Sequence, residues 1–143
     1  MSFFKRPLGL ALSGGGATGA WQAGCLEALE KSGLVFDKIV GFSAGALNGA
    51  AYSLGTMDRS IARWQSMELR QAYKLSPMLR PLSFCSPTTV LGTLEDLLPD
   101  ETAKGLLRND LTVISLCIDD GMPAYARFSP GGKMGCRPGR GRW

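Results

Sequence analysis

Residues 8–19 read Leu-Gly-Leu-Ala-Leu-Ser-Gly-Gly-Gly-Ala-Thr-Gly, and residues 36–45 read Phe-Asp-Lys-Ile-Val-Gly-Phe-Ser-Ala-Gly. Each stretch begins with a short apolar run, which predicts a buried strand, and ends in a glycine-containing turn. A helical pattern follows each turn. The first ends near Gly33 and is expected to turn Trp21 inward, and the second consists mostly of small residues. The order strand, helix, strand, helix predicts an α/β fold with parallel strands.

Further elements are expected downstream. Apolar spacing predicts an amphipathic helix at 57–75, with basic residues along its other side. Three prolines mark 76–87 as a loop, and a short helix is expected at 87–98. Strands are expected at 111–118 and 124–128, joined by a turn. The 57–75 helix either packs its apolar side inward or lies on a membrane surface.

Composition narrows the chemistry. The chain has 143 residues, 45% hydrophobic, with 16 Lys plus Arg, 12 Asp plus Glu and no histidine. One domain is expected at this length. Without histidine, Ser-His-Asp and Cys-His relays are excluded, so a carboxylate, Lys or Tyr must act as any general base. The four cysteines are scattered with no C-x-x-C pair, which speaks against a zinc ribbon.

The excess positive charge lies at one end of the chain. Residues 131–143 contain four basic side chains and no acid, so the remaining 130 residues are electrically balanced. Nucleic acid is therefore not an expected partner, because a binding face needs basic residues clustered on a folded surface.

The N-terminal sequence raises the question of a targeting segment. The apolar run 8–12 is shorter than a signal-peptide core of about 7 to 15 residues, and no run approaches the ~18 apolar residues of a spanning helix. The expectation is a protein of the cytoplasm or the membrane periphery.

Gly41-x-Ser43-x-Gly45 lies between a strand and a helix, the setting of a nucleophile elbow. The two glycines allow the sharp turn that exposes the serine hydroxyl. A serine that only caps the following helix is the alternative interpretation.

The loop at residues 13–19 also lies between a strand and a helix. Its backbone N–H groups and the helix dipole converge on one volume, which favours negative charge. Either it cradles a dinucleotide phosphate, or it forms an oxyanion hole for acyl transfer. A dinucleotide site needs an acid at the far end of the second strand, but Asp37 stands at its start. Because parallel strands end at one edge, the loop should face Ser43.

These two motifs, in this order and separation, resemble the patatin-like phospholipase family, strongly over residues 8–55 and more weakly to Ser129. The resemblance implies a three-layer α/β/α domain with a mainly parallel sheet. It also implies a lipid acyl hydrolase with a Ser-Asp dyad, acting on phospholipids or acylglycerols without metal or cofactor, in possible contact with a membrane surface. Ser43 would be the nucleophile. Backbone amides would form the oxyanion hole at Gly14, Gly15 and Gly16. Glycines with a structural role in the motifs would be Gly19, Gly41 and Gly45. Thr18 stands where many members carry a basic residue.

The family's catalytic aspartate lies in a D-G-[AG] motif, and Asp120-Gly121 is the sole D-G pair of the sequence. Met122 follows it in place of Ala or Gly, and the setting is that of a turn, so Asp120 is a weak candidate for the base. We expect a patatin-like portion at 1–130 that is incomplete at its C-terminus, and an unstructured tail at 131–143. A shifted reading frame, a native flexible tail and a lipid-binding basic tail all fit the tail's composition. The alternative function is a catalytically silent fragment that binds a lipid or a protein.

Overall fold

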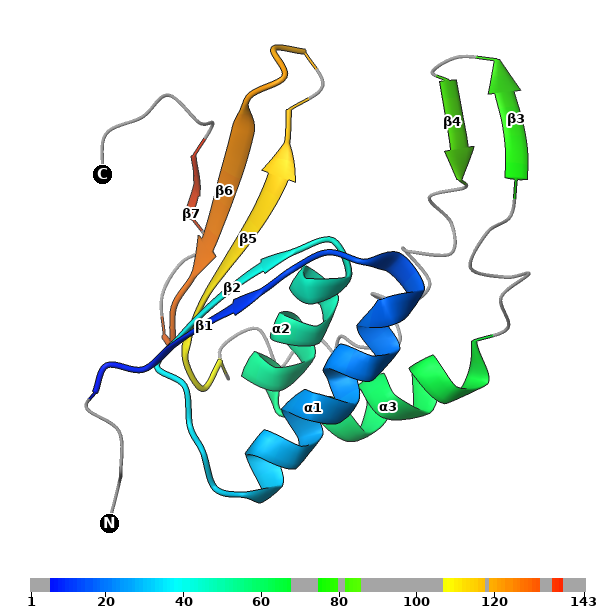
Figure 1. The fold of residues 1–143 in the computed structure, drawn as a ribbon. Coiled ribbons are helices and arrows are strands. Elements are labelled where there is room, and N and C mark those ends of the chain that lie inside the picture. The colour runs from blue at the N-terminus through cyan, green and yellow to red at the C-terminus, as the bar shows by residue number, and fades with distance from the viewer. Residues whose placement is uncertain are drawn as a thin grey trace.

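The computed structural model describes residues 6–67, 107–117 and 119–131 with their side chains, and the backbone of residues 75–79, 82–85 and 135–137. Its main feature is a five-stranded sheet in the order β1-β2-β5-β6-β7 (Figure 1). The strands are β1 (Gly9–Leu12), β2 (Lys38–Phe42), β5 (Asp110–Leu116), β6 (Pro123–Phe128) and β7 (Gly135–Arg137). The first three are parallel and the last two antiparallel. The predicted α/β fold is confirmed.

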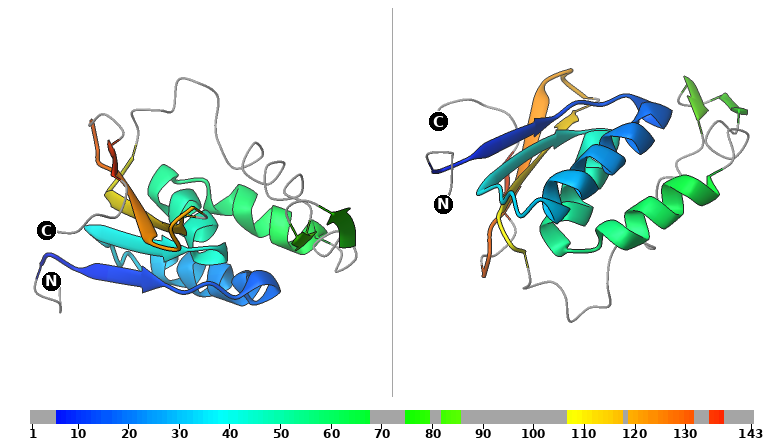
Figure 2. Two further views of the ribbon diagram at one scale, coloured as in Figure 1. Left: turned by 90° about the horizontal axis from the view of Figure 1, so that it is seen from above. Right: turned by 60° about the horizontal axis from the view of Figure 1, so that its bottom comes forward.

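The described residues form three α-helices, of which the first two follow the glycine-containing turns. They are α1 (Gly19–Lys31), which a 3-10 turn η1 (Gly16–Thr18) precedes, α2 (Ala44–Leu54) and α3 (Met57–Ser66). The chain moves from β1 to β2 to β5 in one direction, and right-handed crossovers in one direction place their helices on one face of a sheet. Both views in Figure 2 show the three helices together on that face.

The core lies between this helix layer and the sheet. Because side chains alternate along a strand, Leu12, Ile39 and Leu111 from neighbouring strands all point toward the helices. They meet apolar side chains from α1, α2, α3 and the segment before β2. The buried members from these segments are Ala23, Leu26, Phe36, Ala51, Tyr52 and Met57.

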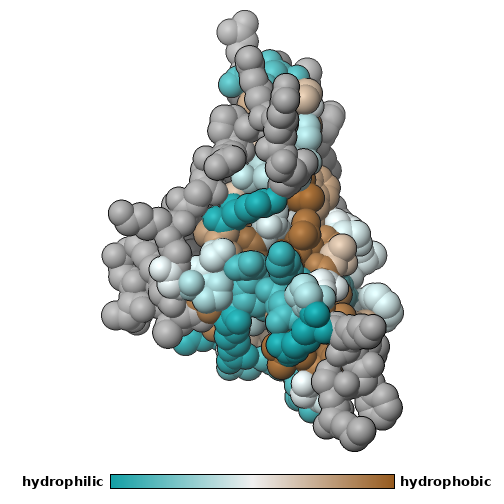
Figure 3. Space-filling model, turned by 90° about the vertical axis from the view of Figure 1, so that its left-hand side faces the viewer, coloured by the Kyte–Doolittle hydropathy of each residue, from teal (hydrophilic) through white to brown (hydrophobic). Residues whose placement is uncertain are grey.

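The opposite face of the sheet carries apolar side chains that the described residues leave exposed. Phe42 at the end of β2 is 49% exposed, and Leu116 at the end of β5 is 64% exposed. Hydrophobic surface is also visible beside hydrophilic surface on the side of the molecule drawn in Figure 3. The described residues thus supply the sheet and one helix layer.

Two predictions in the middle of the chain are wrong. The helix expected at 57–75 ends at Ser66, whose hydroxyl donates a hydrogen bond to the carbonyl of Arg63, and Met67 has an extended backbone. The loop expected at 76–87 contains a hairpin of β3 (Leu75–Leu79) and β4 (Leu82–Cys85). Pro77 is tolerated because the register shifts between Leu75 and Met78, where a missing N–H breaks no regular ladder. The helix expected at 87–98 lies outside the described residues.

Trp21 and the C-terminal segment also differ from expectation. The three-and-four spacing of α1 placed Trp21 with the buried residues, but its side chain is 77% exposed, because Ala23 and Leu26 define the buried side of α1. Within the segment expected to be unstructured, Gly135–Arg137 form β7 against β6. The edge of β6 offers unpaired backbone groups that a short extended segment can bind without needing apolar side chains.

Candidate active site

Ser43 occupies a strained turn between β2 and α2. Its backbone has φ 54° and ψ −124°, and it is the one described residue other than glycine with a positive φ. Such a conformation costs on the order of 1–3 kcal/mol and persists where the surroundings enforce it. The side chain is exposed, and no hydrogen bond ties it to the helix that it precedes. The helix-capping interpretation of this serine therefore lacks its defining contact.

The two glycines of the motif are enforced by close backbone contacts. A Cβ atom at Gly41 would lie 2.5 Å from the carbonyl oxygen of Gly45, and one at Gly45 would collide with the carbonyl oxygens of Leu12 and Ser13. At both glycines the contact would be shorter than real Cβ atoms show. A larger residue at either position would separate the turn from the strand beside it.

The glycine loop after β1 closes on itself. The carbonyl oxygen of Gly15 accepts hydrogen bonds from the backbone N–H of Thr18, at 3.2 Å, and from its hydroxyl, at 2.9 Å. Gly16 has φ 55°, a left-handed conformation that glycine adopts without a Cβ penalty. Thr18, the residue that departs from the family pattern, is thus a closing residue of the loop.

The loop and the serine turn lie beside each other at one edge of the sheet. Leu12 pairs with Gly41 at the ends of β1 and β2, so the residues after both strands emerge together. A Cβ atom built on Gly14 would be 3.1 Å from the Cβ atom of Ser43 and 3.0 Å from the ring of Phe42. The expected adjacency of the loop and Ser43 is confirmed, while their chemical roles stay predictions.

Two helix N-termini meet at this edge. Gly19 begins α1 and Ala44 begins α2, and a Cβ atom on Gly19 would lie 2.8 Å from that of Ala44. Neither helix has an acidic residue in its first turn, so nothing in these turns opposes the positive ends of the two dipoles. The volume next to Ser43 therefore favours a developing negative charge.

Asp120 is a turn residue in the structure. Its Oδ1 atom accepts a hydrogen bond from the backbone N–H of Met122 at 2.9 Å, and Gly121 has φ 67°. Phe42 pairs with Ile114, whereas Asp120 follows well beyond that point, at the tip of the β5–β6 hairpin that projects past the end of β2 in Figure 1. Among the described residues no carboxylate hydrogen-bonds to Ser43.

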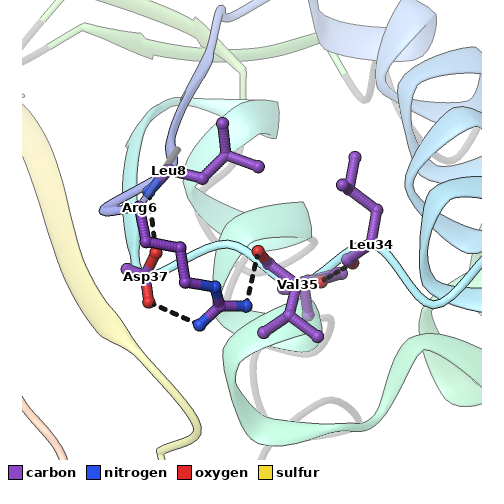
Figure 4. A network of polar contacts seen from close by, with 6 residues as sticks. Arg6, Leu8, Leu34, Val35 and Asp37 are labelled. Carbon is purple, nitrogen blue, oxygen red and sulfur yellow. Dashed lines mark hydrogen bonds and ion pairs between the residues drawn. The ribbon is translucent and has the colours of Figure 1, made fainter. Parts of the chain in front are cut away.

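Asp37 lies at the other end of β2 and has a different task. Its Oδ2 atom accepts a hydrogen bond from the backbone N–H of Leu8 at 2.7 Å, and its Oδ1 atom pairs with Arg6 at 2.9 Å (Figure 4). Arg6 also donates to the carbonyl of Val35. Asp37 therefore ties the start of β1 to β2. A dinucleotide site would need an acid at the C-terminal end of β2, where Phe42 and Ser43 stand instead.

A polar network that was not predicted from the sequence lies behind the glycine loop. Gln22 in α1, Asn48 in α2 and Trp64 in α3 are joined by hydrogen bonds, and Gln22 reaches the carbonyl of Ser13. Asn48 was the available signal, because an amide among the small and apolar residues of α2 needs partners if it is buried.

The fold and this edge define an α/β protein with a glycine-rich loop facing a serine turn. Residues 10–116 match the sequence model of the patatin-like phospholipase family, and the chain belongs to that family. None of the helices in the described ranges has the length and apolar character needed to cross a membrane.

Similar proteins carry names of lipid and ester hydrolases. Lysophospholipase nte1 of Aspergillus terreus is 52% identical over 48 residues, which are 34% of this chain and 3% of that protein. Neuropathy target esterase sws of Drosophila grimshawi is 31% identical over 104 residues, and that of Drosophila melanogaster is 30% identical over 104 residues. Each of these two alignments covers 69% of this chain and 7% of the relative. The chain thus spans a small fraction of these relatives.

Proposed function

We propose that the chain carries the nucleophile and oxyanion hole of a serine lipid acyl hydrolase. The observation that carries the proposal is the strained, exposed Ser43 with Gly14 directly beside it. Strain at a single non-glycine residue is typical of functional sites, since a residue free to relax would do so. Membership of a phospholipase family supports lipid hydrolysis as the reaction class.

In the proposed reaction the Ser43 oxygen attacks the ester carbonyl carbon while a carboxylate accepts the hydroxyl proton. The carbonyl π electrons move to the oxygen, and backbone N–H groups of Gly14, Gly15 and Gly16 hold the resulting oxyanion. Collapse of the intermediate expels the alcohol, which takes up the proton, and water then releases the acyl group. No metal or cofactor takes part in these steps.

The substrate class proposed is a lipid ester, either a phospholipid or an acylglycerol. The names of the relatives support this, since they describe a lysophospholipase and an esterase. Access to such substrates would bring the protein to a membrane surface from the cytoplasmic phase. The proposal assigns residues 1–130 to the patatin-like portion and 131–143 to a tail, of which Gly135–Arg137 pair with β6.

A second candidate is a catalytically silent fragment that binds a lipid or a protein. The observation that favours it is the position of Asp120, whose carboxylate is engaged in its own turn at the hairpin tip. A nucleophile without a base would keep its geometry but lose activation, which contributes typically 10²–10⁴-fold.

Labelling with a fluorophosphonate probe separates the two candidates. The wild-type chain, Ser43→Ala and Asp120→Asn are incubated with the probe and with a short-chain p-nitrophenyl ester. The hydrolase proposal expects labelling and turnover in the wild type and neither in Ser43→Ala. Because Asp120 is a turn residue, Asp120→Asn should retain both activities if another carboxylate is the base. A wild-type chain without labelling or turnover would establish the silent fragment instead.

A further inference from the structure

Asn48 connects three helices behind the proposed oxyanion loop. Its side chain is fully buried, at 0% exposure. The Nδ2 atom donates to the carbonyl of Gly19 at 2.9 Å and to Oε1 of Gln22 at 3.0 Å, and Oδ1 accepts from Nε1 of Trp64 at 2.9 Å. One amide thus links α1, α2 and α3 with both of its N–H groups and its oxygen in use.

The chemistry of the outer partners fixes the direction of every bond in this network. An indole N–H can only donate, and a backbone carbonyl can only accept. The amide of Asn48 therefore cannot be turned over, and it must present N–H to Gln22. Gln22 then has its oxygen toward Asn48 and its nitrogen free to donate, and Nε2 lies 3.2 Å from the carbonyl oxygen of Ser13.

The orientation of the Ser13 carbonyl determines the orientation of the next amide. The peptide between Ser13 and Gly14 is planar and trans, so its C=O and N–H point in opposite directions. Gln22 holds the carbonyl toward the helix layer, where its oxygen lies close to the backbone of Gly45. The Gly14 N–H consequently points away from the helices, and Gly14 is the residue directly beside Ser43.

We propose that Gln22 is a positioning residue that orients the Ser13–Gly14 peptide for oxyanion binding, and that Asn48 and Trp64 set the direction of its amide. The inference deepens the proposed function and rests on it. A direct hydrogen-bond donor in an oxyanion hole is worth about 10²–10³ in rate, and a misplaced group loses a part of this.

Two substitutions remove the donor without changing the size of the side chain greatly. Gln22→Glu presents a second oxygen to the Ser13 carbonyl, and Gln22→Met removes both hydrogen bonds without adding charge. Ala28→Glu is the matched control, since it adds a charge to the same helix at an exposed position. Trp64→Phe removes the N–H donor that sets the orientation of the Asn48 amide. It therefore tests whether the direction of the hydrogen bonds is set from Trp64 toward Gln22.

The experiment has a structural and a kinetic readout on the full chain. Isotope labelling gives the chemical shifts of the Ser13 carbonyl carbon and the Gly14 amide, and fluorophosphonate labelling gives the reactivity of Ser43. Both Gln22 variants should move the two shifts and slow labelling by about 10-fold, with Ala28→Glu unchanged in both. Trp64→Phe should shift the side-chain amide signals of Gln22.

The two readouts keep this inference separate from the proposed function. Unmoved Ser13 and Gly14 signals in both Gln22 variants would overturn it, as would moved signals with labelling at the wild-type rate. If the wild-type chain is not labelled at all, the proposed function fails, and the shifts alone decide whether Gln22 orients the peptide.

Discussion

A methyl group placed on Gly45 would lie 2.6 Å from the carbonyl oxygen of Ser13. The turn that carries Ser43 and the loop that follows β1 thus pack backbone against backbone. This contact fixes the spacing between the proposed nucleophile and the proposed oxyanion hole, because neither side can move closer and any side chain would force them apart.

Gly45→Ala is therefore expected to lower the free energy of unfolding by about 1–3 kcal/mol, the usual range for overpacking. Urea denaturation measures the change. Gly24→Ala is the matched control, because Gly24 lies in α1 with no atom within 4 Å of its Cβ position. That variant should gain about 0.5–1 kcal/mol, since alanine favours a helix over glycine. Equal effects of the two variants would contradict the close contact at Gly45.

Ser43→Gly is expected to stabilise the fold while abolishing the proposed nucleophile. The φ of 54° is strained for serine and free for glycine, so the free energy of unfolding should rise by about 1 kcal/mol. Ser43→Ala keeps the Cβ atom and should remain near the wild type. Thermal and urea unfolding of the three proteins test the order, and a destabilised Ser43→Gly would show that the turn is not strained.

Asp37 should matter more to stability than the cation beside it. Asp37→Ala leaves the Leu8 N–H without its acceptor, which costs about 1–3 kcal/mol. Arg6→Ala removes an exposed ion pair and should cost less than about 1 kcal/mol. Urea denaturation of both variants gives the comparison. Because Asp37→Ala also removes the ion pair, equal losses in the two variants would show that the hydrogen bond from the Leu8 N–H to Asp37 adds nothing.

Tyr52 predicts a pH dependence at the alkaline end. Burial raises the pKa of its phenol above the usual value of about 10, and the hydroxyl donates to the carbonyl of Leu34 at 3.0 Å. The unfolded chain then loses the phenolic proton at lower pH than the folded one. The contribution of this pKa difference to the free energy of unfolding is fully present below about pH 10. It is lost as the pH rises through the folded-state pKa.

Tyr52→Phe should reduce this alkaline decline. The comparison is urea denaturation of both proteins at several pH values from neutral to above pH 10. The variant is expected to lose about 0.5–1.5 kcal/mol at neutral pH with its hydrogen bond, and the gap between the proteins should narrow at high pH. A gap that stays constant across this range would show that the phenol does not titrate differently on folding.

Two leucines are expected to differ in their effect on stability, because one lies in the core and the other on the sheet face opposite the described helices. Leu26 is 1% exposed and Leu116 is 64% exposed. Leu26→Ala should cost about 2–5 kcal/mol, and Leu116→Ala should stay within about 0.5 kcal/mol of the wild type. Urea denaturation measures both. A loss of more than about 2 kcal/mol at Leu116 would show that this face is covered in solution.

The predictable parts of the fold were those with a strong local pattern. The strands and helices around the two motifs follow from apolar runs, glycine turns and the order of elements, and the register of Leu12 with Gly41 brings both turns to one edge. The prediction of a helix at 57–75 was wrong in its end point. The helical spacing of apolar residues continues past Ser66, but the backbone becomes extended at Met67. The prediction that Trp21 is buried was wrong because spacing alone does not tell which side of α1 meets the sheet.

The sequence by itself determined the α/β class, the positions of the serine turn and the glycine loop, and the lack of histidine within this chain, because these depend on residue types and short-range spacing. Only the tertiary structure decided that Gln22, Asn48 and Trp64 form one network, since these residues come from three helices. It also decided that the Asp37 carboxylate accepts a hydrogen bond from the Leu8 N–H, and that the Asp120 carboxylate accepts one within its own turn. The physical reason is that hydrogen-bond direction and close backbone contact depend on how elements far apart in the chain pack together.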